Sequence, residues 1–162
     1  MPIYMKYGSI AGDVTESGHT GWIELNSFQW GVGRGVSTAT GSGEDREASS
    51  PSVSEITVTK DLDKASIKLL TEAYQGDGGG DGATVQIDFV RTAAGAQQIF
   101  LTVTITDVMI SGFSWSSGGD RPSESLSLNF VKITNNFIPM GPDGKPGNGI
   151  NVAYDIGLAK IP

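Results

Sequence analysis

The stretch that decides the fold reads IFLTVTITDVMI and occupies residues 99–110. Apolar residues stand at every second position from Ile99 to Ile105, a period of two that is typical of a β-strand with one buried face. After Ile105 the apolar positions shift to Val108 and Ile110. We therefore expect a one-residue bulge that restores the buried face and bends the strand. Long bent strands are what a curved or closed sheet requires.

The same alternation recurs on both sides of this stretch. It predicts further strands over residues 3–7, 52–60, 84–91, 124–130 and 150–158. A second shift of the apolar positions separates Ile23 and Leu25 from Phe28 and Trp30, which predicts another bulge. Glycine accounts for 23 of 162 residues and clusters between the apolar runs, where tight turns need it. The chain is therefore predicted to be a mainly β protein.

One helix is expected within this β framework. Residues of helical spacing form an apolar face, namely Leu62, Ala65, Leu69, Leu70 and Ala73. Asp61 or Asp63 can cap its start, and Gly76 can end it. We expect this short helix to pack one face on the sheet.

Length and composition exclude several classes of protein. The length of 162 residues suits one domain, residues 1–162. The absence of cysteine excludes disulfides, thiolate metal sites and cysteine nucleophiles. A net charge of -7 argues against a nucleic-acid partner. We see neither a cleaved signal nor a run of roughly 18 apolar residues, so we expect a cytoplasmic start and no membrane insertion. Export would need a route that recognises the folded protein.

Candidate catalytic and metal-binding groups are few. His19 is the one histidine, and a Ser-His-Asp device would have to use it, but the sequence lacks a G-x-S-x-G elbow. We interpret His19 as a solvated loop residue. Residues 77–82 (DGGGDG) invite a calcium interpretation, but they lack the spacing and closing glutamate of an EF-hand. We expect no catalysis, no cofactor and no metal.

Residues 31–51 form a long polar loop, which is uncommon in so small a domain and is usually functional or disordered. It carries the charged cluster Glu44-Asp45-Arg46-Glu47. The acidic pair Glu44 and Asp45 is either a solvated tip or part of an inter-subunit salt contact with Arg46 or Arg121. Only 18% of the residues are charged, which fits surfaces that meet other subunits and equally fits a Ser/Thr/Gly-rich β protein.

The order of these pieces resembles the haemolysin-coregulated protein (Hcp) family over nearly the whole chain. The similar segments are IYMKYG at residues 3–8, GDV at 12–14, GWIELNSFQWGV at 21–32, ITVTKDLDKAS at 56–66 and GGDRPSESLSLNF at 118–130. Residues 75–82 and 141–149 do not match the family with confidence. No single motif carries the resemblance, which rests on the order of the segments.

The resemblance implies a β-barrel of two packed antiparallel sheets with one short flanking α-helix and a long extended loop. It also implies that six copies form a ring with a wide pore, and that rings stack into the inner tube of the bacterial type VI secretion machine. Contraction of the sheath would expel the tube, a spike trimer would cap it, and small effectors would travel in its pore. The family further implies contact with the baseplate and secretion without a signal peptide. Some members carry a fused toxin domain, which we do not expect here.

The resemblance also suggests roles for particular residues. Ring stacking would involve the extended loop, with Arg34, Glu44, Asp45, Arg46 and Glu47. Asp120 and Arg121 would contact a neighbouring subunit, and Gln29 would face the pore. An alternative from another class is a carbohydrate-binding β-sandwich that uses Trp22 or Trp115 as a platform.

Overall fold

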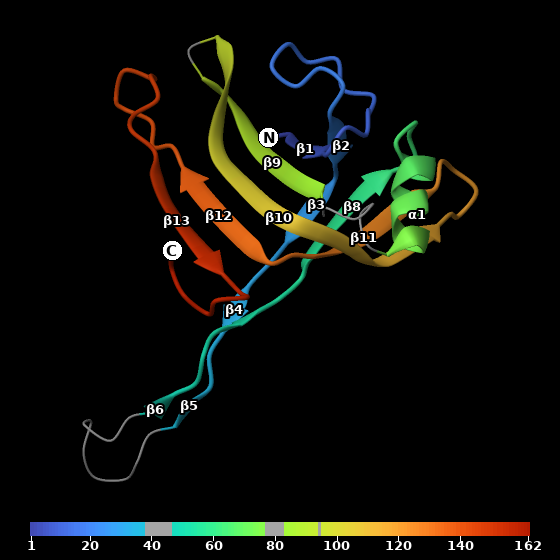
Figure 1. Ribbon diagram of the computed structural model, residues 1–162. Helices are drawn as coiled ribbons and strands as arrows, with labels where there is room; N and C mark the ends of the chain where they lie inside the picture. Colours follow the sequence, from blue (N-terminus) through green and yellow to red (C-terminus); the bar gives the residue numbers. More distant parts are fainter. Residues whose placement is uncertain (38–46, 77–82, 94) are drawn as a thin grey trace.

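The computed structural model describes residues 1–37, 47–76, 83–93 and 95–162. Strands dominate, with one helix among the described residues (Figure 1). In chain order the elements are β1 (Ile3–Tyr7), β2 (Ile23–Leu25), β3 (Ser27–Gln29), β4 (Val32–Gly33), β5 (Val36–Ser37), β6 (Glu47–Ala48), β7 (Ser52–Val53), β8 (Ile56–Asp61), α1 (Ser66–Gln75), β9 (Ala83–Ala93), β10 (Ala96–Ser116), β11 (Ser123–Asn129), β12 (Lys132–Phe137) and β13 (Ile150–Asp155).

The strands form two antiparallel sheets that share β10. The first sheet contains β2, β1, β9, the first half of β10, β12 and β13, and the second sheet contains the second half of β10, β11, β8 and β3. Hydrogen bonds connect them in the order β2-β1-β9-β10-β11-β8-β3, and β12 and β13 extend the first sheet from β10. The two ends of this path, β2 and β3, are separated only by Asn26. The single segment 23–29 therefore pairs with β1 through its first half and with β8 through its second half. The predicted mainly β fold of packed antiparallel sheets with one short helix is confirmed.

The bend in β10 lies where the sequence predicts it. The pairing of β10 with β9 shifts register between Ile105 and Val108, and Asp107 between them has a positive φ of 53°. The first half of the strand pairs with β9 and β12, and the second half pairs with β11. The other predicted shift falls at Asn26, where the segment changes its partner strand.

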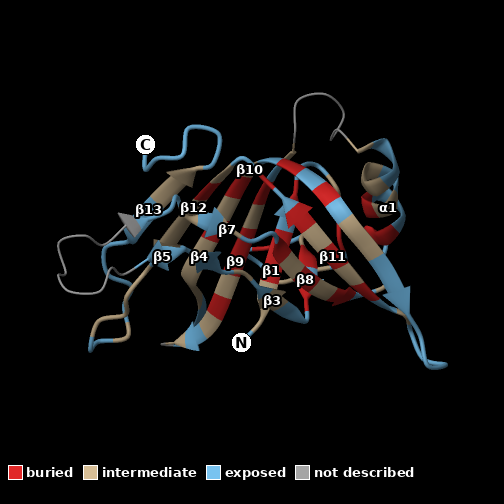
Figure 2. Ribbon diagram, turned by 90° about the horizontal axis from the view of Figure 1, so that it is seen from below, coloured by how far each residue is buried: buried red, intermediate tan, exposed pale blue. Residues whose placement is uncertain are grey.

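The core lies between the two sheets (Figure 2). It contains the alternate apolar residues of the strands, including Ile87, Ile105, Leu126 and Leu128, all fully buried. Helix α1 adds Leu69 to this core and contacts β10. Gly76 ends the helix with a φ of 76°, as predicted. No side chain caps the first turn. Instead, the Asp63 carboxylate accepts the N–H of Ala65 at 3.0 Å, just before the helix begins.

A buried ion pair joins the helix start to the second sheet. Lys60 on β8 and Glu124 on β11 are both fully buried, and Lys60 Nζ lies 2.9 Å from Glu124 Oε2. The same ammonium donates to Asp63 Oδ1 at 2.9 Å and to Ser66 Oγ at 3.1 Å. Glu124 also accepts the indole N–H of Trp115 at 2.9 Å. The pair thus has hydrogen-bond partners on both sides, as a buried charge requires.

Two features project from the two packed sheets. The β4–β7 and β5–β6 pairs form a narrow two-stranded ribbon, here called the arm, that extends far from the sheets in Figure 1. The β12–β13 hairpin extends the first sheet on one side of the molecule. Sequence alternation did not reveal β12, and the strand predicted over residues 150–158 ends at Asp155. Within the described residues, the single helix is too short and polar to cross a membrane.

Replacement of Lys60 by Met is expected to lower the free energy of unfolding by about 3–5 kcal/mol, because it leaves the Glu124 carboxylate buried without its cation. The double variant Lys60→Met/Glu124→Leu should recover much of this loss. Urea-induced unfolding at one fixed protein concentration measures the free energy of unfolding of both variants. Lys64, which is exposed and 3.9 Å from Asp13, is the control, and Lys64→Met should change stability by less than about 1 kcal/mol. Equal effects at the two lysines would contradict this expectation.

Burial and the nearby charge of Glu72 raise the pKa of Tyr7 to about 12. An unfolded phenol loses its proton near pH 10, so the stabilising contribution of Tyr7 is complete below about pH 10 and is lost between about pH 10 and pH 12. Glu72→Gln should lower the pKa of Tyr7. Phenolate absorbance during alkaline titration measures this pKa, and the variant Tyr7→Phe shows which part of the signal comes from Tyr7. An unchanged titration in Glu72→Gln would contradict the role of that charge.

Candidate functional site

An apolar sheet face continues beyond the core and is left uncovered. On the first sheet Ile105 pairs with Ile133, which pairs with Tyr154, and this end of the face is largely buried. Four residues further along β12, Phe137 is 46% exposed, and its partner Ile150 is 68% exposed. Val152, between Ile150 and Tyr154 on the same face, is 50% exposed. Ile150 and Val152 of β13 thus continue the apolar face of the core but remain exposed in the single chain.

A groove forms where this hairpin meets the base of the arm. Its apolar lining comes from both parts and includes Trp30, Val32, Pro51, Val53, Val152 and Ile161. Trp30 is half-buried against the core, and its buried indole N–H has no hydrogen-bond partner within the described part of the chain. Trp30 therefore belongs both to the margin of the core and to the groove.

The outer edge of the hairpin is bridged at one end, where Asp155 pairs with Lys160, and no described strand pairs with the rest of it. Among the strands that the structure describes, β13 pairs only with β12. Such an edge presents backbone N–H and C=O groups that another chain can pair with. We call the exposed residues Phe137, Ile150 and Val152 together with the groove and this edge the hairpin face.

Gln29 belongs to a different surface, the outer side of the second sheet. It is exposed on β3 and pairs with Thr57 of β8, which in turn pairs with Ser127 of β11. The adjacent row runs from Ser27 through Thr59 and Ser125 to Ser114. Both rows lack charged side chains. This hydroxyl wall, named for the serines and threonines of these two rows, is therefore polar and uncharged within the rows, and the carboxylate of Glu55 adjoins it, where it accepts from Ser111 and Asn129.

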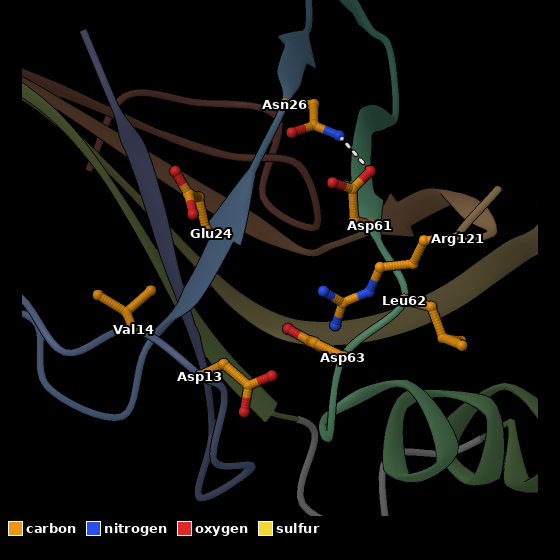
Figure 3. A pocket seen from close by; sticks show the side chains of 8 residues that line it. All are labelled: Asp13, Val14, Glu24, Asn26, Asp61, Leu62, Asp63 and Arg121. Atoms are coloured by element: carbon orange, nitrogen blue, oxygen red, sulfur yellow. Dashed lines mark hydrogen bonds between the residues drawn. The ribbon is translucent and has the colours of Figure 1, made fainter.

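Arg121, expected to contact a neighbouring subunit, lies among carboxylates of its own chain (Figure 3). The pocket that it lines contains Asp13, Glu24, Asp61 and Asp63. Asp61 accepts a hydrogen bond from Asn26 at 3.0 Å, and Asp63 is already paired with Lys60. Asp120 is exposed in the preceding turn, and its backbone oxygen accepts a hydrogen bond from Ser117.

The charged residues predicted for ring stacking are only partly described. Arg34 is exposed on the arm, between β4 and β5. Glu44, Asp45 and Arg46 lie outside the described residues, and Glu47 is described only as part of the backbone of β6. The structure therefore places Arg34 and Gln29 on separate surfaces and does not test the charged cluster.

The interpretation of His19 as a solvated loop residue is wrong. Its side chain is 95% buried and forms close contacts with the carboxylates of Glu16 and Asp88. Trp22 packs edge-on against it, with ring centroids 4.6 Å apart. Sixty-nine residues separate His19 from Asp88, so local sequence gave no signal of this contact. Among the described residues, no cluster of three or more histidine and acidic side chains is placed to hold a metal ion.

Comparisons with known proteins agree with this architecture. The family model described as "Type VI secretion system effector, Hcp" matches residues 4–137. The Pseudomonas aeruginosa protein hcp1 is 26% identical over 158 residues, which cover 95% of this chain and 94% of that protein. A solved type six secretion system protein superimposes with a TM-score of 0.87 at 28% identity, covering 99% of both chains. Hcp1 from Salmonella typhimurium gives a TM-score of 0.74 at 20% identity, covering 99% of this chain and 97% of that one.

The family model covers most of the chain, including the strands β1 to β12 and helix α1. The similarity to the solved type six secretion system protein extends over nearly the full length, including the arm and the β12–β13 hairpin. The chain belongs to the Hcp family of the type VI secretion system.

Proposed function

We propose that this Hcp protein is the structural subunit of the type VI secretion inner tube, that it forms hexameric rings, and that the rings stack into the tube. The observation that carries the proposal is the hairpin face, an apolar continuation of the core that a single chain leaves in water. Burying apolar surface is worth roughly 25 cal/mol per Å². A surface of this kind therefore favours contact with a second copy.

The position of the hairpin face suits a ring. It lies at the free edge of one sheet, so a neighbour can cover Ile150 and Val152 without displacing any strand of the barrel. Contact of this face with a different face of the next copy is head-to-tail, and such contacts close into a ring when the rotation between copies allows it. Asp120 and Arg121 are further candidates for this subunit contact, with Arg121 at the mouth of an acidic pocket.

The arm supports a second contact, between rings. A two-stranded ribbon without a core of its own is at best marginally stable in water. Here Val32 and Val36 are 54% and 49% exposed, so the described part of the arm has apolar surface to offer a partner. Arg34 lies between these two valines on the same ribbon. We assign the arm, including Arg34, Glu44, Asp45, Arg46 and Glu47, to ring stacking.

The hydroxyl wall supports a pore-facing role for Gln29. A neutral polar surface offers weak hydrogen bonds to a passing protein without strong electrostatic attraction or repulsion. Small effectors could therefore be held during transport and released afterwards. In this proposal the spike trimer, the contractile sheath and the baseplate are the other partners, and the protein is cytoplasmic before the machine expels it.

The surroundings of the tryptophans support a carbohydrate-binding role less well than the hairpin face supports a tube subunit. Trp22 packs against His19, and the indole N–H of Trp115 is donated to Glu124, although the Trp115 ring is 47% exposed.

We propose that the protein has no catalytic activity. Its one histidine, His19, is buried, and both ring nitrogens are occupied by contacts with Glu16 and Asp88, so neither is left to reach a substrate.

Val152→Asp is expected to abolish or strongly weaken ring formation, because a carboxylate would have to be buried in the apolar contact without a partner. Light scattering after size exclusion, together with negative-stain images, should show hexameric rings for the original protein and smaller species for the variant. Asn151→Asp is the matched control, since it adds the same charge to the opposite face of β13. Rings in Val152→Asp as abundant as in the control, or a strictly monomeric original protein at micromolar concentration, would refute the proposal.

Gln29→Arg is expected to leave ring assembly intact and to change which effectors co-purify with the rings. The substitution introduces a positive charge into a neutral wall, so it should favour acidic cargo and disfavour basic cargo. Gln29→Asn, which preserves the amide, is the control. The measurement is mass spectrometry of proteins retained by purified rings. Rings that assemble normally and retain an identical set of cargo in both variants would count against a pore-facing Gln29.

A further inference from the structure

The hydroxyl wall changes its chemistry at the end that adjoins the arm. β8 directs Thr57 and Thr59 outward, and Glu55, two residues before Thr57, is exposed on the same side. Its neighbour across the sheet is Asn129 of β11, whose amide Nδ2 donates to Glu55 Oε1 at 3.3 Å. The wall that is uncharged around Gln29 therefore ends in a carboxylate.

Two neutral donors orient this carboxylate. The hydroxyl of Ser111 on β10 donates to Glu55 Oε2, and the amide of Asn129 donates to Oε1. A carboxylate has about four positions at which its oxygens accept hydrogen bonds. Glu55 thus keeps acceptor positions for a further donor, and its exposure allows a donor from another molecule to reach them.

No cation that the structure describes is paired with Glu55. The ion pairs among the described residues all involve other acids. The two rows of the wall present only hydroxyl and amide side chains, which neither attract nor repel a charged group strongly. The sign of the charge at this end of the wall is therefore set by Glu55.

The opposite end of the wall differs in this respect. Asp61, at the other end of β8, is also exposed on this side, but it accepts from Asn26 at 3.0 Å. It lines the same pocket as Arg121 (Figure 3), so a cation of the chain itself already stands among the carboxylates there. The carboxylate without such a companion is the one near the arm.

An apolar side chain completes the row of Glu55. Asn129 pairs with Met109 of β10, and paired residues of antiparallel strands point to the same face of a sheet. Met109 is 45% exposed. Lysine and arginine carry a cationic head on an aliphatic stem, and the stem packs on apolar surface while the head remains in a polar environment. The row Glu55–Asn129–Met109 offers a place for each part.

We propose that Glu55 determines which cargo the pore prefers, and that the row Glu55–Asn129–Met109 binds lysine and arginine side chains of the cargo. The cationic head donates to the free acceptor positions of Glu55, and the stem lies against Met109. One such contact at an exposed site is weak. A ring of copies repeats it, so cargo with several basic residues is held by several weak contacts at once. This inference rests on the proposed pore-facing role of the hydroxyl wall.

The test uses two short labelled peptides of equal length, one of alternating lysine and serine and one of alternating glutamate and serine. Fluorescence anisotropy with the full-length protein at about 0.1 M salt measures their Kd. The original protein should bind the lysine peptide more tightly. Glu55→Gln should weaken this binding by roughly threefold or more, because the amide can keep the contacts with Ser111 and Asn129 but loses the charge. Glu55→Lys should reverse the preference between the two peptides.

Asp143→Asn is the matched control, because it removes the same charge from the exposed turn between β12 and β13 of the first sheet. Screening by salt should keep its effect below about twofold. Equal effects of Glu55→Gln and Asp143→Asn, or tighter binding of the glutamate peptide by the original protein, would overturn the role of Glu55. Light scattering on the same samples tests the tube separately. If no rings form, the tube proposal fails, and the two variants still decide whether Glu55 binds basic side chains on the single chain.

Discussion

One strand belongs to both sheets, and the architecture depends on it. β10 pairs with β9 and β12 through its first half and with β11 through its second half, so the bend at Asp107 sets the angle between the sheets. The apolar residues on its inner side remain directed at the core through this corner, because the bulge restores their alternation. The segment 23–29, whose two halves are the terminal strands β2 and β3, completes the arrangement from the opposite side by pairing with β1 and with β8.

Because β10 bends at Asp107, the two sheets present outer surfaces with different chemistry. The second sheet turns its serines and threonines outward, which produces the hydroxyl wall around Gln29. The first sheet continues past the region that the second sheet can cover, so the β12–β13 hairpin keeps an apolar face without a neighbour. The buried Lys60–Glu124 pair fixes the start of α1 against β8 and β11. In this chain, the core and the uncovered hairpin face are thus two parts of the same apolar sheet face.

Much of this fold is predictable from alternation alone, and the exceptions have physical causes. The strand at residues 3–7, the bulge after Ile105 and the helix stop at Gly76 are confirmed, because each depends on local sequence. β12 was missed because its polar residues Thr134, Asn135 and Asn136 interrupt the apolar pattern. The exposure of Ile150 and Val152 could not be predicted, because periodicity reports which side of a strand is apolar, and not what covers it. His19 was misread because its decisive partner, Asp88, is distant in sequence.

The positive φ of Asp107 restricts what evolution can place at the corner of β10. Aspartate and asparagine tolerate this left-handed conformation, glycine adopts it freely, and a β-branched side chain would clash with the backbone. Valine, isoleucine and threonine, which otherwise suit a strand best, are therefore disfavoured at this one position. The constraint at residue 107 is on backbone conformation, whereas at the buried neighbours Ile105 and Val108 it is on packing. A short polar residue or glycine at this position is therefore expected to mark the turn between the sheets in related chains.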